Sequence, residues 1–307
     1  MIREEYKKQV SLLLSVLPEI AKERCFALHG GTAINLFVRQ MPRLSVDIDL
    51  TYLPLDSREV ALNNITKSLE EIKNRIERFY SQIKVDGPNV DGKMFVSLGG
   101  VSITIEVNLI KRGCYDPPVD MLLCKSAQDM FDAFCAIQIV TPAHLFGGKI
   151  CAALDRQHPR DLFDSKYILD ELVFDKELKK GFIFYLVSGN RPLVELISPK
   201  MIDQSKVFER SFEGMTNVEF SYDDFLSVRE RLVRSVQKSL NKNDVEFLLS
   251  LKRGEPDWSI YDFKEFPAVK WKLQNINISR ETNPMKHLAM YNNLEGKLYD
   301  MLELRLD

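Results

Sequence analysis

Two aspartates separated by one residue, Asp47 and Asp49, have the type and spacing that metal-dependent chemistry requires. They lie in residues 43–50, where polar and apolar residues alternate as they do in a strand. On a strand, residues i and i+2 point to the same face, so the two carboxylates lie side by side. Paired carboxylates repel each other unless a cation lies between them, and Mg²⁺ prefers such oxygen ligands. The alternative is a solvent-facing strand on which these charges have no chemical role.

The sequence Gly30-Gly31-Thr32 is a candidate phosphate-binding turn. It follows the apolar run 25–28, which predicts a buried strand, and it leads into a predicted helix over 32–38. Glycines let backbone N–H groups approach an anion closely, and the start of a helix adds a partial positive charge. A Gly-Gly turn with only a structural role is the alternative.

Glu106 is a candidate third carboxylate because it interrupts the strongly β-branched run 103–109. Strands of this composition are largely buried, and an ionised side chain within one needs a partner. If this strand lies beside the one that carries Asp47 and Asp49, Glu106 becomes a third metal ligand. On an edge strand it would merely face solvent.

A fourth group of charges runs from Lys149 to Asp161. The pattern predicts one helix over 142–155 and another over 161–172, and Lys149 and Arg156 share a helical face because they are seven residues apart. One interpretation is a cationic clamp on a triphosphate, oriented by Asp161. The other is a solvated helix face with Asp161 as a helix cap.

The surrounding pattern predicts the elements that position these residues. Helices are expected over 3–16 and 57–83, strands over 25–28 and 46–52, and a hairpin at 93–98 and 101–109 around Gly99-Gly100. The second half is mainly helical, with a helix over 221–240 and another that begins at a capping box of Asn243 and Glu246. We therefore predict a first domain over 1–140 and a mainly helical domain over 141–307.

Composition limits the class of protein. The chain has 307 residues, of which 45% are hydrophobic and 28% charged, and its net charge is −2. These values are typical of a soluble protein of about two domains and exclude a strongly basic nucleic-acid binder. The five cysteines are odd in number and show no metal-ligand spacing, which indicates free thiols in a reducing cytoplasm. No apolar run is long enough for a membrane span, so we expect a cytoplasmic protein without a membrane partner.

Three segments together resemble a known family. They are residues 29–33 (His-Gly-Gly-Thr-Ala), residues 43–50 (Arg-x-Ser-x-Asp-x-Asp-Leu), and residues 149–164, which end in Arg-Asp-Leu-Phe-Asp. Their order and spacing resemble the AbiEii/AbiGii-type toxin nucleotidyltransferases of bacterial type IV toxin–antitoxin systems, over about residues 25–172. The resemblance implies an α+β fold: a DNA-polymerase-β-like mixed sheet flanked by helices, followed by a mainly helical domain that contributes Lys149 and Asp161 to the active site.

The resemblance also implies an activity. Family members transfer a nucleotide from an NTP, and some relatives modify the acceptor end of tRNA. The expected catalytic residues are Asp47, Asp49, Lys149 and Asp161. The expected phosphate-binding residues are Gly30, Gly31, Thr32, Ser45 and Lys149. The expected ligands of Mg²⁺ or Mn²⁺ are Asp47, Asp49 and Glu106. The expected partners are an NTP, an RNA acceptor such as tRNA, and a cognate antitoxin protein.

Three function classes stay open at this point: an RNA nucleotidyltransferase toxin, a protein-nucleotidylating enzyme of the same chemistry, and a catalytically silent NTP-binding protein. A net charge near zero slightly favours a protein acceptor. Arg231, Arg234 and Lys238 share one helix face and are candidates for RNA phosphate contacts, although an ordinary solvated face is the stronger interpretation. Trp258 and Trp271 could stack bases, but we expect them in the core.

Overall fold

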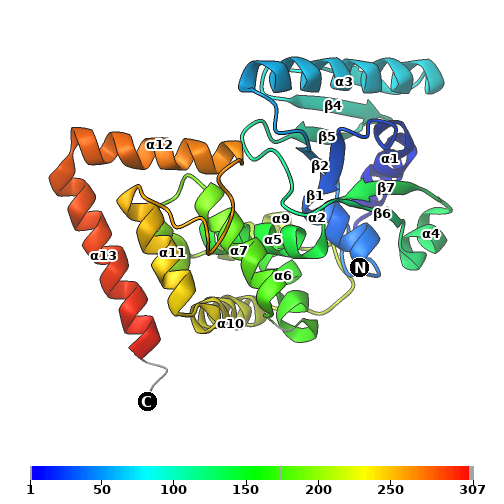
Figure 1. The fold of residues 1–307 in the computed structure, drawn as a ribbon. Helices are drawn as coiled ribbons and strands as arrows, with labels where there is room; N and C mark the ends of the chain where they lie inside the picture. Colours follow the sequence, from blue (N-terminus) through cyan, green and yellow to red (C-terminus); the bar gives the residue numbers. More distant parts are fainter. Residues whose placement is uncertain (1, 173, 304–307) are drawn as a thin grey trace. The chain divides into compact units, whose positions relative to one another are not determined.

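Seven strands form one mixed sheet in the order β3-β4-β5-β2-β1-β7-β6 (Figure 1). Strand β2 runs parallel to β5 and β1 runs parallel to β7, whereas the other neighbours are antiparallel. The predicted combination of a mixed sheet with many helices is therefore confirmed. The strands are β1 (Phe26–His29), β2 (Asp47–Tyr52), β3 (Lys84–Asp86), β4 (Lys93–Leu98), β5 (Val101–Val107), β6 (Val119–Leu122) and β7 (Ala136–Ile139).

The computed structural model describes residues 2–172 and 174–303, which fall into two compact units. The first comprises the chain up to Leu145 together with Glu209–Glu219, and the second comprises Phe146–Phe208 and the chain from Phe220 onward. The chain passes from the first unit to the second inside α5 (Pro142–Arg156), and it enters the returning segment inside α9 (Ser205–Ser211).

The predicted hairpin is confirmed. β4 and β5 pair in antiparallel register and are joined by Gly99 and Gly100, whose φ angles are 57° and 85°. Positive φ at both central residues matches the right-handed twist of the strands, and glycine adopts it without strain.

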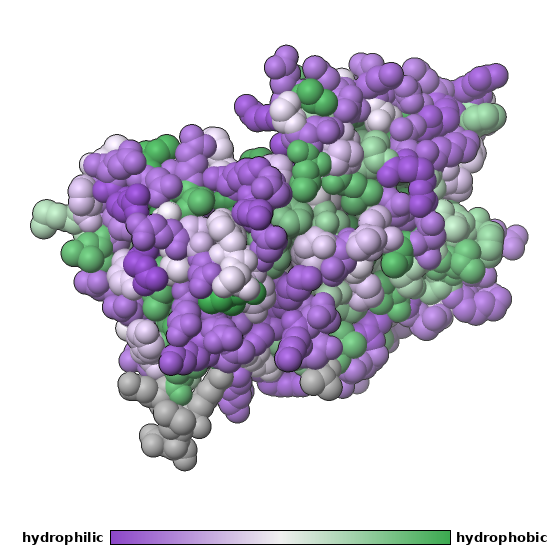
Figure 2. Space-filling model, viewed as in Figure 1, coloured by the Kyte–Doolittle hydropathy of each residue, from purple (hydrophilic) through white to green (hydrophobic). Residues whose placement is uncertain are grey.

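Helices α1 (Glu4–Ile20) and α3 (Arg58–Phe79) pack against each other and against the sheet. Each buries an apolar stripe, and the outer side of α3 at the top of Figure 2 is mainly hydrophilic. Helix α1 does not end before Pro18, as the sequence suggested, but continues through it to Ile20. Pro18 has no N–H to donate to the Leu14 carbonyl, so the helix loses one hydrogen bond there, and the burial of Leu17 and Ile20 holds the last turn against the core.

The second unit is helical. Its elements are the greater part of α5, with α6 (Pro159–Glu171), α7 (Lys176–Ser188), α8 (Leu193–Ile197), α10 (Tyr222–Ser239), α11 (Lys242–Arg253), α12 (Pro267–Thr282) and α13 (Pro284–Glu303). None of the helices in the described part of the chain has the length and apolarity that crossing a membrane demands.

The capping box of α11 is displaced from its predicted position. Asn241 caps the helix and exchanges hydrogen bonds with Asp244, so the prediction of Asn243 with Glu246 was wrong by two residues. A tertiary cluster fixes the choice, because Asp244 also accepts from Tyr261 at 2.6 Å and pairs with Lys179 at 2.7 Å. The local sequence around residue 241 contains no information about these partners, which lie far along the chain.

Helices α5 and α7 cross at two glycines. A Cβ at Gly147 would lie 2.2 Å from the carbonyl carbon of Gly181, so the helix backbones approach more closely than any side chain allows. We expect Gly147→Ala to lower the free energy of unfolding by ~3 kcal/mol or more, since backbone cannot move aside as a flexible side chain can. Urea denaturation measures the difference.

Gly296→Ala is the matched control for this prediction. Gly296 also lies inside a helix, α13, but a Cβ there meets nothing within 4 Å. The same substitution should stabilise the protein by up to about 1 kcal/mol, because alanine has the higher helix propensity. Equal effects of the two variants would contradict the close crossing.

Candidate functional site

The turn between β1 and α2 (Gly30–Ala33) is built around glycine. Gly30 has a φ of 72°, and a Cβ there would lie 2.1 Å from Oδ2 of Asp49. Any larger residue would therefore be strained in its backbone and would displace the Asp49 carboxylate. The sequence assigned Gly30 to phosphate binding and Asp49 to metal binding. In the structure these two residues lie directly against each other.

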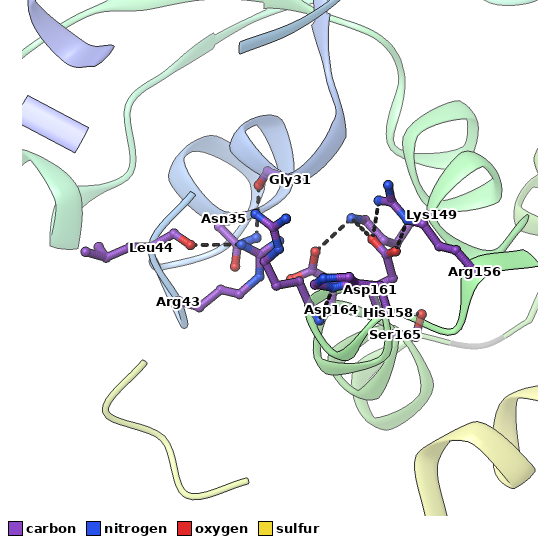
Figure 3. Close-up of polar contacts among 11 residues, drawn as sticks. Gly31, Asn35, Arg43, Leu44, Lys149, Arg156, His158, Asp161, Asp164 and Ser165 are labelled. Carbon is purple, nitrogen blue, oxygen red and sulfur yellow. Dashed lines mark hydrogen bonds and ion pairs between the residues drawn. The ribbon is translucent and has the colours of Figure 1, made fainter. Parts of the chain in front are cut away.

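Gly31 is enclosed by polar side chains. A Cβ at Gly31 would lie 2.8 Å from Nη2 of Arg43 and 2.9 Å from Oγ of Ser45, and both of these side chains are buried. Asn35, in η1 (Ile34–Val38), donates to the Gly31 carbonyl at 2.9 Å, and Arg43 donates to the Leu44 carbonyl at 2.8 Å (Figure 3). The guanidinium of Arg43 and the hydroxyl of Ser45 therefore both lie beside the glycine turn.

Thr32 is oriented away from the role that the sequence suggested. Its side chain is fully buried, and Oγ1 donates to the backbone carbonyl of Asp47. The hydroxyl therefore ties α2 to the start of β2. Its assignment to phosphate binding stays a prediction.

The carboxylates share one face of the sheet. Asp47 and Asp49 alternate with Ile48 and Leu50, which are buried in the core. In the parallel pairing of β2 with β5, Asp49 lies opposite Glu106, so this third carboxylate lies on the same face. The neighbouring strands that the metal-ligand interpretation of Glu106 requires are therefore present.

Glu106 already has a cationic neighbour. Lys93 lies opposite it on β4, and its Nζ is 3.4 Å from Oε2 of Glu106, whose side chain is 46% exposed. Within residues 2–172 and 174–303, no three His, Cys, Asp or Glu side chains are grouped closely enough to hold a metal ion. Mg²⁺ commonly uses only one or two carboxylates together with substrate phosphates and water, and Asp47 and Asp49 fit that requirement.

Two histidines lie behind the turn. His29 ends β1, and its ring centroid is 6.0 Å from that of His144, whose ring packs at a tilt against Tyr115 with 4.9 Å between centroids. Burial lowers the pKa of His144 well below its ordinary value, and the nearby His29 lowers it further. The His144 imidazole is therefore neutral near pH 7. No sequence pattern pointed to His144, since a lone histidine on a helix usually packs in the core.

A segment from far along the chain supports the loop that precedes β2. The Leu44 N–H donates to the carbonyl of Met215 at 2.8 Å, and Thr216 Oγ1 donates to the carbonyl of Pro42 at 2.7 Å. These contacts place Glu209–Glu219 in the first unit and hold the backbone on either side of Arg43.

The second unit contains a cluster of three buried charges and one exposed charge, drawn in Figure 3. Lys149 Nζ lies 3.0 Å from Oδ1 of Asp161 and 2.9 Å from Oδ2 of Asp164, and all three side chains are at least nine-tenths buried. Arg156, which is 64% exposed, donates to both oxygens of Asp161. Asp161 is therefore not a solvated cap: it binds Lys149 directly.

The electrostatics of this cluster favour the ionised state. Burial by itself raises the pKa of Asp161, but the charges of Lys149 and Arg156 outweigh it and hold the pKa well below its usual value. Asp164 is a partner that the sequence interpretation did not assign, although it stands three residues after Asp161, on the same face of α6.

The elbow between α5 and α6 is fixed by Gln157. Its φ is 49°, its side chain is buried, and its amide donates to the Lys200 carbonyl at 2.7 Å. Its oxygen accepts from the Ile202 N–H and from Arg229, both at 3.0 Å. This elbow joins the helix of Lys149 to the helix of Asp161, and no sequence motif indicated it.

The other candidates have ordinary environments. Arg231 pairs with Asp170 at 2.8 Å and Arg234 with Glu230 at 3.7 Å, as expected of a solvated helix face. Trp271 is 51% exposed, so its expected place in the core was wrong. It lies on the outer side of α12, whose buried residues are Ala268, Val269 and Ile276.

We expect Asp161→Asn to lower the free energy of unfolding at pH 7 by about 2 kcal/mol, because it leaves Lys149 with only one buried counter-charge. The folded-state pKa of Asp161 is depressed, so its stabilisation is present above the unfolded value of 3.8 and is lost as pH falls below it. The difference between wild type and variant should therefore shrink between about pH 5 and pH 3. Denaturation at several pH values measures it.

Asp300→Asn is the control, because Asp300 is exposed on α13. It should leave both the stability and its pH dependence unchanged. A constant difference between wild type and Asp161→Asn across this pH range would refute the charge-cluster argument.

Comparisons with known proteins agree with the fold and with the family resemblance. The family model for the nucleotidyl transferase AbiEii toxin of type IV toxin–antitoxin systems matches residues 11–275. Among solved structures, the chain is similar to MenT4, a nucleotidyltransferase toxin from Mycobacterium tuberculosis H37Rv, with a TM-score of 0.60 and 14% identity over 89% of this chain and 95% of that one. None of the curated proteins gives a significant match. The family model spans most of the chain, and the protein therefore belongs to the AbiEii family of nucleotidyltransferase toxins of type IV toxin–antitoxin systems.

Proposed function

We propose that the enzyme transfers NMP from an NTP to a hydroxyl of RNA, at the 3′ end of tRNA, with Mg²⁺ held by Asp47 and Asp49. The observation that carries the proposal is the apposition of the Gly30 turn and the Asp49 carboxylate. A turn that presents backbone N–H groups suits phosphate, and carboxylates beside it suit a cation that bridges to phosphate. Family membership implies the NTP substrate and an antitoxin partner.

In the first unit, we assign phosphate binding and metal binding to separate sets of residues. The backbone of Gly30 and Gly31 and the hydroxyl of Ser45 bind phosphate oxygens, and Arg43, buried against Gly31, adds positive charge there. Asp47 and Asp49 hold the metal, and Glu106 adds a third carboxylate once Lys93 releases it. When bound, Mg²⁺ neutralises phosphate charge and acidifies the acceptor hydroxyl. The neutral His144 packs against His29, the residue that precedes the glycine turn.

In the second unit, Lys149 has the role that its motif implies, which is to neutralise the phosphates of the NTP. Asp161 and Asp164 fix its ammonium group from two sides. Because an ammonium held in place needs no reorganisation when charge develops, it stabilises a transition state better than a mobile one does. Arg156 shares Asp161 and is exposed, so it can meet a ligand as well.

Asp47→Ala should lower nucleotide transfer by at least ~10²-fold, because it removes a metal carboxylate. The assay uses purified protein, Mg²⁺, each α-³²P-labelled NTP in turn and total tRNA. Asp86→Ala, on the edge strand β3, is the control and should retain activity. Label in added lysate protein instead of RNA would replace the RNA acceptor with a protein one. No label in either would refute transfer under these conditions.

Gly30→Ala tests the apposition itself. Both Gly30 and Gly99 have positive φ, so alanine should cost each site roughly 1 kcal/mol of stability. Only at Gly30 does the added Cβ meet Asp49, whereas at Gly99 it meets nothing within 4 Å. We therefore expect Gly30→Ala to lower transfer by on the order of 10²-fold and Gly99→Ala to leave it unchanged. Equal activities would show that the close approach has no catalytic role.

A further inference from the structure

Three helices of the second unit bring basic side chains together away from the motif residues. Lys252 and Gly254 lie at the end of α11, Arg280 lies on α12, and His287 lies on α13. These helices pack against one another. A Cβ at Gly254 would lie 3.1 Å from Nη1 of Arg280, so the Arg280 guanidinium lies directly against the end of α11.

Two of these side chains are largely covered, and the buried ring nitrogen of His287 lacks a hydrogen-bond partner in the described part of the chain, whereas the ammonium group of Lys252 reaches solvent. Lys252 is 9% exposed and forms no hydrogen bond or ion pair with any described residue. His287 is 7% exposed, and its buried Nδ1 has no hydrogen-bond partner. Buried polar groups in proteins are nearly always satisfied, and an exception calls for an explanation such as a ligand.

Cations predominate around these two side chains. Burial lowers the pKa of Lys252, and no carboxylate of the described residues counteracts the effect. Burial also lowers the pKa of His287, and the charges of Lys252 and Arg280 lower it further. Arg280, which is 41% exposed, pairs with the exposed Glu255 at 3.6 Å and donates to the Arg253 carbonyl at 2.8 Å. Lys252 and Arg280 leave this region with an excess of positive charge, which a bound anion would offset.

We propose that Lys252, Arg280 and His287 form a phosphate-binding site that receives a phosphodiester of the acceptor RNA. The RNA assignment rests on the proposed function, whereas the phosphate chemistry does not. The family model ends at residue 275, before Arg280 and His287, and it assigns no role to these residues.

A simpler explanation is a lysine that stabilises the C-terminus of α11 through the helix dipole. That role predicts that Lys252→Met lowers stability by the same amount in any buffer. A phosphate site predicts that Lys252→Met lowers the stability of the protein by more when phosphate is present than when it is absent. The substitution isolates the charge, because methionine keeps the apolar stem of the lysine.

The first experiment measures Tm of wild type, Lys252→Met, Arg280→Gln and Lys297→Met in rising inorganic phosphate at constant ionic strength. Lys297 is an exposed lysine of α13 and serves as the control. We expect phosphate to raise Tm of wild type and Lys297→Met, and to have little effect on the other two. The same phosphate response in all four proteins would overturn the site.

The second experiment measures the Kd for total tRNA against salt, with Asp47→Ala as the background so that no transfer occurs. Lys252→Met and Arg280→Gln should weaken binding about tenfold and reduce the slope of log K against log salt by about 1, whereas Lys297→Met should change neither.

Phosphate stabilisation without any effect on tRNA affinity would overturn the RNA assignment. Unchanged tRNA binding by these variants, with transfer to tRNA intact in the wild type, would overturn this inference alone and leave the proposed function standing.

Discussion

The contact between the Asp49 carboxylate and Gly30 is the constraint on which the first unit depends. It fixes the carboxyl-terminal end of β1 against the middle of β2, and it leaves no room for a side chain on the turn. On β2, the residues that alternate with the carboxylates are Ile48 and Leu50, which are buried in the core. A shift of one residue in the register of β2 would bury both aspartates and expose the core. The strand that carries the chemistry is thus held in place by hydrophobic burial.

The second unit obeys a different constraint, the compensation of buried charge. The buried carboxylates of Asp161 and Asp164 share the buried ammonium of Lys149, and the exposed Arg156 supplies a second cation to Asp161. Such clusters contribute more to a defined geometry than to stability, because burial offsets much of the attraction. The elbow at Gln157 must hold both helices for this geometry to persist, and its three side-chain hydrogen bonds join it to Lys200, Ile202 and Arg229.

The features that the sequence predicted correctly are those that local rules determine. Alternation placed Asp47 and Asp49 on one strand face, and paired glycines placed the hairpin turn. Helical spacing predicted a shared face for Lys149 and Arg156, which both contact Asp161. The features that were missed depend on distant partners: the Asn241 cap is fixed with Lys179 and Tyr261, and the roles of Asp164 and Gln157 appear only once helices have packed. Trp271 was misplaced because hydrophobicity alone does not indicate which side of α12 is covered.

The first unit is not continuous in the sequence, because it includes Glu209–Glu219. The loop around Arg43 obtains two of its hydrogen bonds from Met215 and Thr216. During synthesis, the ribosome releases the motif residues early, but the loop cannot complete these bonds until residue 216 has emerged. A chain truncated before that point contains every motif residue yet lacks the support of the loop. Nascent and prematurely terminated copies of this toxin therefore carry an unfinished site.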